Sequence, residues 1–230
     1  MTRHSTLPRR NLMSDKLTLH ELTGSPNNVK VRIALGYKGL KYDRKPVEFD
    51  DYPGDRSSVV ELSRQPRLPL LQDDQTVIFG SDAILRYLEA NFPDTPPIFS
   101  DDHQTFGEIE QWELFVRTQI GEPIGMLFGQ AFAPEPDAQV IAKANELLND
   151  RTGALEDKLN TGEFLVGEHL TAADIACAAP LYLADLTDEN AESHPIAGFF
   201  RTHLNLGDGR EKTRAWVRRV MAYDPVRGRR

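Results

Sequence analysis

Cysteine is almost absent from this sequence, in which Cys177 is the only one among 230 residues. A single cysteine excludes any disulfide within the chain and any metal site built from several cysteines. Long apolar runs are missing too, and none approaches the roughly 20 residues that a membrane-spanning helix needs. The first dozen residues lack the apolar central stretch of a secretory signal. These absences predict a protein of the reducing cytoplasm, with no metal and no membrane partner.

Positive charge is also in short supply. Lysine and arginine total 27, against 35 aspartates and glutamates, which gives a net charge of −8. A nucleic-acid-binding domain is usually basic, so this balance argues against a nucleic-acid partner. Basic clusters lie at 9–10 and 227–230, where they are typical of solvated tails. We expect residues 1–15 to form a disordered extension, in which Met13 is a candidate for the true start.

The first half of the chain alternates short strands with helices. Gly39 is expected to end the first helix, and Asp73-Asp74-Gln75 to form the turn of a hairpin. The order of elements predicts a thioredoxin-like α/β domain over 16–92, although the pattern alone leaves ferredoxin-like arrangements open. Before the hairpin it allows a helix or a loop. The expected strands lie at 16–22, 42–49, 69–72 and 76–79, and the expected helices at 26–39 and 81–91.

The second half shows no strand pattern. The proline-rich stretch 93–97 predicts a linker, which we extend over 93–104. Apolar residues at helical spacing then predict an all-α domain over 105–230, arranged as a helical bundle. Its first helix is expected to bend before Pro123. The expected helices lie at 106–129, 136–161, 171–186 and 213–223.

The segment Leu170-Thr171-Ala172-Ala173-Asp174-Ile175 is the clearest local motif. Thr171 and Asp174 have the spacing of a capping box, in which each residue satisfies an amide of the other. The helix that follows is apolar nearly all round and is therefore expected to be buried. Cys177 lies in it, so we expect an inert core thiol, since reactive thiols need an exposed electropositive setting.

Three positions in the first half carry candidate chemistry, and each also has a purely structural interpretation. Ser25 before Pro26 suits a helix N-cap, or a hydroxyl that donates to an anion at the positive helix end. Ser81 after Gly80 has the same two interpretations at the next helix. Leu68-Pro69 opens a strand: a cis bond would leave the Leu68 backbone free to pair with an extended peptide, while a trans proline would simply start the strand.

Taken together, these motifs resemble the glutathione-binding domain of the cytosolic glutathione transferases. The serine–proline helix start is followed some forty residues on by leucine–proline, and then by Ser81 and the run Ala83-Ile84-Leu85-Arg86-Tyr87-Leu88. The Leu170–Asp174 box and the segment from Trp216 to Pro225 resemble the helical domain of the same family. The resemblance covers roughly residues 16–225.

The resemblance implies roles for individual residues. Ser25 matches the hydroxyl that activates the thiol of glutathione in the serine-type classes, and Asn27 matches the asparagine of the bacterial disulfide-reductase-like branch. Leu68 matches the residue whose backbone pairs with the cysteinyl unit, with Pro69 as the cis-proline. Ser81 matches the residue that binds the γ-glutamyl carboxylate. Arg67 lies where the family often has a basic or polar residue near the glycyl end.

Three departures from the family pattern narrow the chemistry. Thr23 lies where the tyrosine classes place their catalytic tyrosine, which excludes that mechanism. Ser25 lies where omega-like classes have cysteine, so a mixed disulfide with the enzyme is not expected. Gly80 replaces the acidic residue or glutamine that helps to hold the γ-glutamyl ammonium, and this loss predicts weaker glutathione binding.

The resemblance therefore predicts a homodimeric cytoplasmic detoxification enzyme with glutathione as co-substrate. Its thiolate would attack a small-molecule electrophile, or reduce a peroxide or disulfide. Trp112, Phe115 and Gln119 are the expected substrate-pocket residues, with Phe128 and Phe132 as further candidates, although aromatic residues at helical spacing are more often core. The alternative is a non-catalytic glutathione-transferase-like protein-interaction module, as in the elongation factor 1 gamma subunit, which Gly80 favours.

Overall fold

The computed structural model describes residues 17–47, 55–187 and 195–227. The expected extension at 1–15 and the end of the strand expected at 42–49 lie outside these ranges. Four strands form one sheet in the order β2-β1-β3-β4, with β1 and β2 parallel and the other neighbours antiparallel. The strands are β1 (Leu17–Leu22), β2 (Tyr42–Val47), β3 (Leu70–Asp73) and β4 (Thr76–Phe79).

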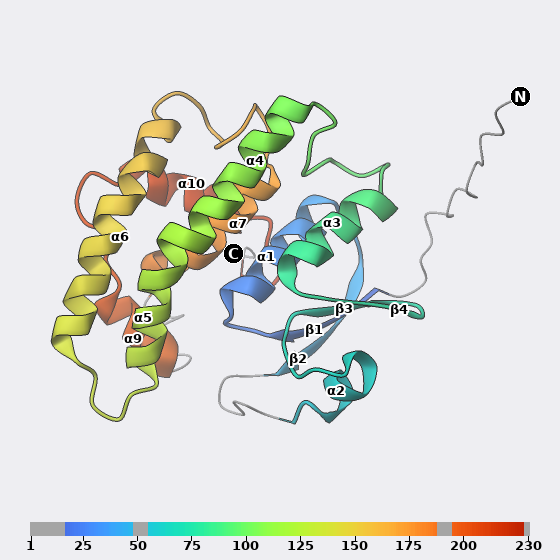
Figure 1. Cartoon of the computed structure of the whole chain (residues 1–230), viewed down its shortest axis with the longest axis horizontal. Helices are drawn as coiled ribbons and strands as arrows, with labels where there is room; N and C mark the ends of the chain where they lie inside the picture. Colours follow the sequence, from blue (N-terminus) through green and yellow to red (C-terminus); the bar gives the residue numbers. More distant parts are fainter. Residues whose placement is uncertain (1–16, 48–54, 188–194, 228–230) are drawn as a thin grey trace, which may run out of the picture.

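Three helices accompany the sheet. Figure 1 shows α1 and α3 on one side of it and α2 on the other. Gly39 follows α1 with φ +66°, a left-handed conformation that suits glycine, and the chain turns there into β2. The segment left open as helix or loop contains a helix. The three helices are α1 (Pro26–Tyr37), α2 (Ser57–Ser63) and α3 (Ser81–Asn91).

Beyond residue 102, every described element is helical, which confirms the predicted fold class. Figure 1 shows α4 leading down into α5, α5 beside α6, and α9 and α10 behind them. The helix α9 was not predicted, while the others lie close to their expected positions. They are α4 (His103–Phe115), η2 (Val116–Ile120), α5 (Gly121–Ala131), α6 (Ala138–Leu159), α7 (Ala172–Leu181), η3 (Tyr182–Asp185), α9 (Pro195–His203) and α10 (Glu211–Met221).

The helix expected at 106–129 is interrupted by the π-helical turn η2, which lies just before Pro123. Proline has no amide hydrogen, so the carbonyl of Gln119 loses its usual helical donor. The guanidinium of Arg151 on α6 donates to that carbonyl at 2.7 Å. The irregularity is therefore satisfied by a side chain from the neighbouring helix.

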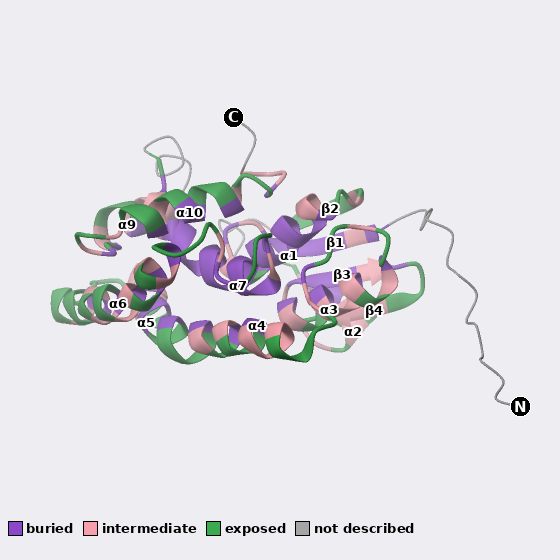
Figure 2. Ribbon diagram, turned by 90° about the horizontal axis from the view of Figure 1, so that it is seen from above, coloured by how far each residue is buried: buried purple, intermediate pink, exposed green. Residues whose placement is uncertain are grey.

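The helix α7 is the centre of the α-helical half, and all of its residues are buried (Figure 2). Its capping box forms as predicted. The Asp174 carboxylate accepts from the amides of Thr171 and Leu165, both at 2.9 Å, and from the indole of Trp216 at 2.9 Å. A residue expected to cap one helix therefore also holds a loop and α10 against it.

The end of the described chain packs against α1. Arg32 is fully buried and donates two hydrogen bonds to Asp224, at 2.9 and 2.8 Å, and another to Glu21. Burial alone lowers the pKa of Arg32, but the hydrogen bonds and charges of Asp224 and Glu21 raise it overall. At Gly36, a Cβ atom would lie 1.9 Å from the carbonyl oxygen of Tyr223. Only glycine allows this approach between α1 and the chain segment after α10.

Candidate functional site

Ser25 ends the loop between β1 and α1 and presents its side chain at the start of the helix. Its carbonyl accepts from the amides of Asn28 and Val29, both at 3.0 Å, but its hydroxyl makes no capping hydrogen bond. Two contacts fix this loop from either side: the Asn28 side chain accepts from the Leu22 amide at 3.1 Å, and the Tyr182 hydroxyl donates to the Gly24 carbonyl at 2.9 Å. Among the described residues nothing pairs with the Ser25 hydroxyl, so the capping interpretation is not supported.

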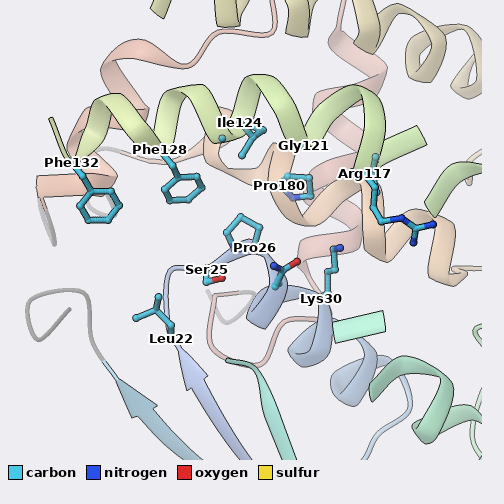
Figure 3. Close-up of a pocket in the computed structure, with 13 residues that line it drawn as sticks. Leu22, Ser25, Pro26, Lys30, Arg117, Gly121, Ile124, Phe128, Phe132 and Pro180 are labelled. Carbon is cyan, nitrogen blue, oxygen red and sulfur yellow. The ribbon is translucent and has the colours of Figure 1, made fainter. Parts of the chain in front are cut away.

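A cavity of about 500 Å³ opens in front of this hydroxyl. Figure 3 shows Ile124 and Phe128 on α5, and Phe132 just after it, across the cavity from Leu22, Ser25 and Pro26. One wall is therefore apolar, and the other carries the start of α1. The lining residues are Leu22, Ser25, Pro26, Asn27, Lys30, Val116, Arg117, Gly121, Ile124, Gly125, Phe128, Phe132 and Pro180.

The first turns of α1 and α3 meet beside this cavity. The Ser81 hydroxyl lies 3.5 Å from the side-chain oxygen of Asn27 and 3.4 Å from that of Asp82. Gly80, which precedes α3, has φ +88°, a conformation that favours glycine. Asn27 and Ser81, which are 54 positions apart in the sequence, thus lie together at the amide ends of two helices, a setting that favours anions.

The Leu68–Pro69 peptide bond is cis, as the family resemblance implies. The Pro69 carbonyl accepts from the Gly80 amide at 3.2 Å, which joins the start of β3 to the start of α3. Within the described part of the chain, no hydrogen bond engages the backbone of Leu68. Arg67 is exposed, and its amide donates to Gln65. Arg67, Leu68, Pro69, Gly80 and Ser81 do not line the cavity.

Comparison with known proteins agrees with this architecture. A family model for the glutathione S-transferase N-terminal domain matches residues 19–96, and one for the C-terminal domain of the same proteins matches residues 112–224. The chain belongs to the glutathione transferase superfamily. The two matches together span the sheet, the cavity and most of the helical half.

The superfamily members that are similar to this chain include a protein named as a transferase and proteins named otherwise. It is 27% identical to elongation factor 1-gamma 2 of Oryza sativa, over 73% of this chain and 40% of that protein. It is 28% identical to glutathione S-transferase F10 of Arabidopsis thaliana, over 63% of this chain and 70% of that one. The structure of yeast Ure2p in complex with glutathione superposes with a TM-score of 0.69 at 22% identity, covering 90% of this chain and 94% of that one. The chain spans less than half the length of the elongation factor subunits it matches.

The three residues first expected to form the transferase substrate pocket lie outside the cavity. Trp112 and Phe115 pack edge to face at 5.3 Å, and the Trp112 carbonyl accepts from the Cys177 thiol at 3.6 Å, so this pair belongs to the core around α7. Gln119 is exposed, with its amide near Thr118. Helical spacing alone could not separate the two faces of α4.

The cavity wall comes instead from the next helix, and it includes two of the further candidates, Phe128 and Phe132. The sequence interpretation missed Lys30, Arg117, Ile124 and Pro180. Lys30 did carry a signal, since it lies three residues after Asn27 and so shares its helix face. Arg117 did not, because the π-helical turn shifts it out of regular helical phase.

Cys177 is fully buried, and burial raises the pKa of its thiol. A thiol that remains protonated and inaccessible is a poor nucleophile. The structure therefore agrees with an inert core cysteine.

In residues 17–47, 55–187 and 195–227, no three His, Cys, Asp or Glu side chains gather as they would around a metal ion. None of the described helices is long and apolar enough to cross a membrane.

Proposed function

We propose that this chain is a glutathione transferase in which the Ser25 hydroxyl stabilises the thiolate of bound glutathione. The observation that carries the proposal is the Ser25 hydroxyl itself, which is unpaired among the described residues, lies at the start of a 12-residue helix and faces a cavity with an apolar wall. Asn27 would assist, Leu68 would pair with the cysteinyl backbone, and Ser81 would hold the γ-glutamyl carboxylate. Arg67 would lie near the glycyl end.

The energy that such a site must supply is modest. A free thiol has a pKa of about 8.5, and lowering it by two units takes roughly 2.7 kcal/mol of preferential stabilisation of the thiolate. A hydrogen bond to a charged group contributes about 1.5–3 kcal/mol, and the helix N-terminus about 0.3–1 kcal/mol more. One hydroxyl and one helix are therefore enough.

A non-catalytic glutathione-transferase-like interaction module is the second candidate. Gly80 favours it, since no carboxylate precedes Ser81, and so does the similarity to an elongation factor 1-gamma subunit. Homodimerisation, a cytoplasmic location, a role in detoxification and a small-molecule electrophile stay predictions from the family.

Turnover and binding together separate the two candidates. We expect the chain to bind glutathione in a calorimetric titration and to accelerate its conjugation with chlorodinitrobenzene or another member of a panel of electrophiles, peroxides and disulfides. Binding without acceleration across the whole panel would favour the interaction module, as would the absence of any binding.

Ser81→Ala tests how glutathione is held. If Ser81 binds the γ-glutamyl carboxylate, loss of its hydrogen bond weakens binding by about 1.5 kcal/mol, or roughly tenfold. We take the low end of the usual range because the amides of α3 remain in place. Calorimetric titration beside a thermal melt measures both effects. In the structure Gly80 occupies the N-cap position of α3, and among the described residues no side chain caps this helix. Unchanged affinity with a lower melting temperature would therefore show that the Ser81 hydroxyl serves only the stability of the fold.

A further inference from the structure

The cavity has two chemically different ends. Phe128 and Phe132 form an apolar end, whereas Lys30 and Arg117 lie at the other, with Ser25 between the two (Figure 3). The lining contains two cations and no aspartate or glutamate among its described residues. The cavity lining is therefore positively charged, although the chain as a whole has a net charge of −8. Such an end attracts anions.

Of the two cations, Lys30 is the less exposed and has the weaker ion pair with Asp82. Its side chain is only 10% exposed, and its ammonium lies 3.8 Å from the nearer oxygen of Asp82, at the outer limit of an ion pair. Across residues 17–47, 55–187 and 195–227, no acceptor lies within hydrogen-bonding distance of this ammonium. Most of the Lys30 side chain is packed into the protein, and the residue lines the cavity. The donors of Lys30 are therefore available to a ligand in the cavity.

Arg117 approaches the same point from the helical half. It lies in the π-helical turn η2, a kind of irregularity often found at functional sites. Its guanidinium lies 3.3 Å from the other oxygen of Asp82, and its side chain is 51% exposed. Asp82 is thus shared by two cations and neutralises only one of them. One positive charge remains for a ligand.

We propose that the second substrate of this transferase is an amphipathic anion: an apolar or aromatic electrophile that carries a carboxylate. The aromatic body would lie against Phe128 and Phe132, and the carboxylate between Lys30 and Arg117. This assignment rests on the function proposed above. With an aryl chloride, the thiolate sulfur attacks the carbon that bears chlorine, the carbon–sulfur bond forms, and chloride leaves with the electrons of the carbon–chlorine bond. The carboxylate is unchanged, and the thiol proton passes to solvent.

Two matched electrophiles test the proposal without any mutation. Chlorodinitrobenzoate and chlorodinitrobenzamide share the reacting ring and differ in the charge of the para substituent. We expect kcat/KM, divided by the uncatalysed rate, to be about 10- to 100-fold higher for the benzoate, the range for a charge-assisted hydrogen bond. High salt should reduce the preference, because Arg117 is half exposed. Equal values for the two compounds would overturn the proposal.

Variants then locate the group responsible. Lys30→Gln should remove most of the preference for the benzoate while leaving the benzamide rate and the affinity for glutathione nearly unchanged. Arg117→Gln should remove a smaller part. Lys143→Gln, which loses the same charge from an exposed position on α6, is the control and should retain the preference. A preference that survives in both Lys30→Gln and Arg117→Gln would also overturn the proposal.

Two outcomes separate this inference from the function on which it rests. If Lys30→Gln instead weakens glutathione binding tenfold and leaves the preference intact, Lys30 serves glutathione and the inference fails while the transferase stands. If neither electrophile is turned over and the wider panel of electrophiles, peroxides and disulfides is inert as well, the transferase proposal fails, and calorimetric binding of the two compounds then tests the anion site alone. If the wild-type protein binds the benzoate more tightly than the benzamide, and Lys30→Gln abolishes this difference, the anion site is supported. Equal binding of the two compounds would overturn it.

Discussion

Ser25→Ala is expected to raise the pKa of the bound glutathione thiol by about one to two units, because each unit corresponds to 1.36 kcal/mol of lost thiolate stabilisation. Turnover at neutral pH should fall roughly ten- to a hundredfold and recover partly in alkali, where solvent removes the proton without help. The affinity for glutathione should change less, because Leu68 and Ser81 still hold the peptide. Ultraviolet absorbance of the bound thiolate, followed across pH, gives the measurement.

Ser58→Ala on α2 is the matched control and should leave the titration unchanged. Identical curves for the wild-type protein and Ser25→Ala would show that the hydroxyl plays no part in activation. The next candidates would then be Thr23 and Asn27, which lie on either side of Ser25 in the same loop and helix start.

Asp224→Asn is expected to lower the free energy of unfolding by about 3–5 kcal/mol, the usual cost of removing one partner from a buried ion pair. Arg32 and Asp224 are both fully buried, and the two carboxylate oxygens accept from two nitrogens of the guanidinium. Asparagine keeps the shape but removes the charge, so Arg32 would retain Glu21 as its only acidic partner among the residues that the structure describes. Urea unfolding followed by circular dichroism measures the change.

The exposed pair Arg218–Asp185 provides the comparison, since its side chains are 63% and 23% exposed. Asp185→Asn should cost no more than about 1 kcal/mol, because solvent screens such pairs. A similarly small effect for Asp224→Asn would mean that the buried network contributes little to stability.

Elements built from local rules could be predicted from the sequence. Pro26 and Gly39 mark the ends of the α1 region, and the Thr171–Asp174 box starts α7, because caps and breakers act within a few residues. The hairpin around Asp74 has the same origin: this residue adopts φ 53°, a conformation that aspartate tolerates. The order of these elements left thioredoxin-like and ferredoxin-like arrangements open, and the family resemblance favoured the first.

Features that depend on distant contacts could not be predicted. Nothing in the sequence pairs Arg32 with Asp224, which lies 192 positions away. The π-helical turn was visible only as an expected bend, so the orientation of Arg117 was missed. The serine positions show a different limit: serine suits a helix start whether it caps or binds a ligand, and only the unpaired hydroxyl of Ser25 in space distinguishes the two.

The close approach between Gly36 and Tyr223 has a consequence for the order in which the chain folds. The helix α1 is covered by a segment that is synthesised much later, and the charge of Arg32 is neutralised on that side only when Asp224 arrives, 192 residues further along the chain. During synthesis the sheet can form early, because its strands all lie within residues 17–79. The helix α1 also packs against α7, and its side next to Tyr223 stays open to water until the segment after α10 emerges. The first half of this chain therefore completes its surface after translation has passed it, and a shortened chain that ends before Tyr223 would leave the Gly36 side of α1 uncovered.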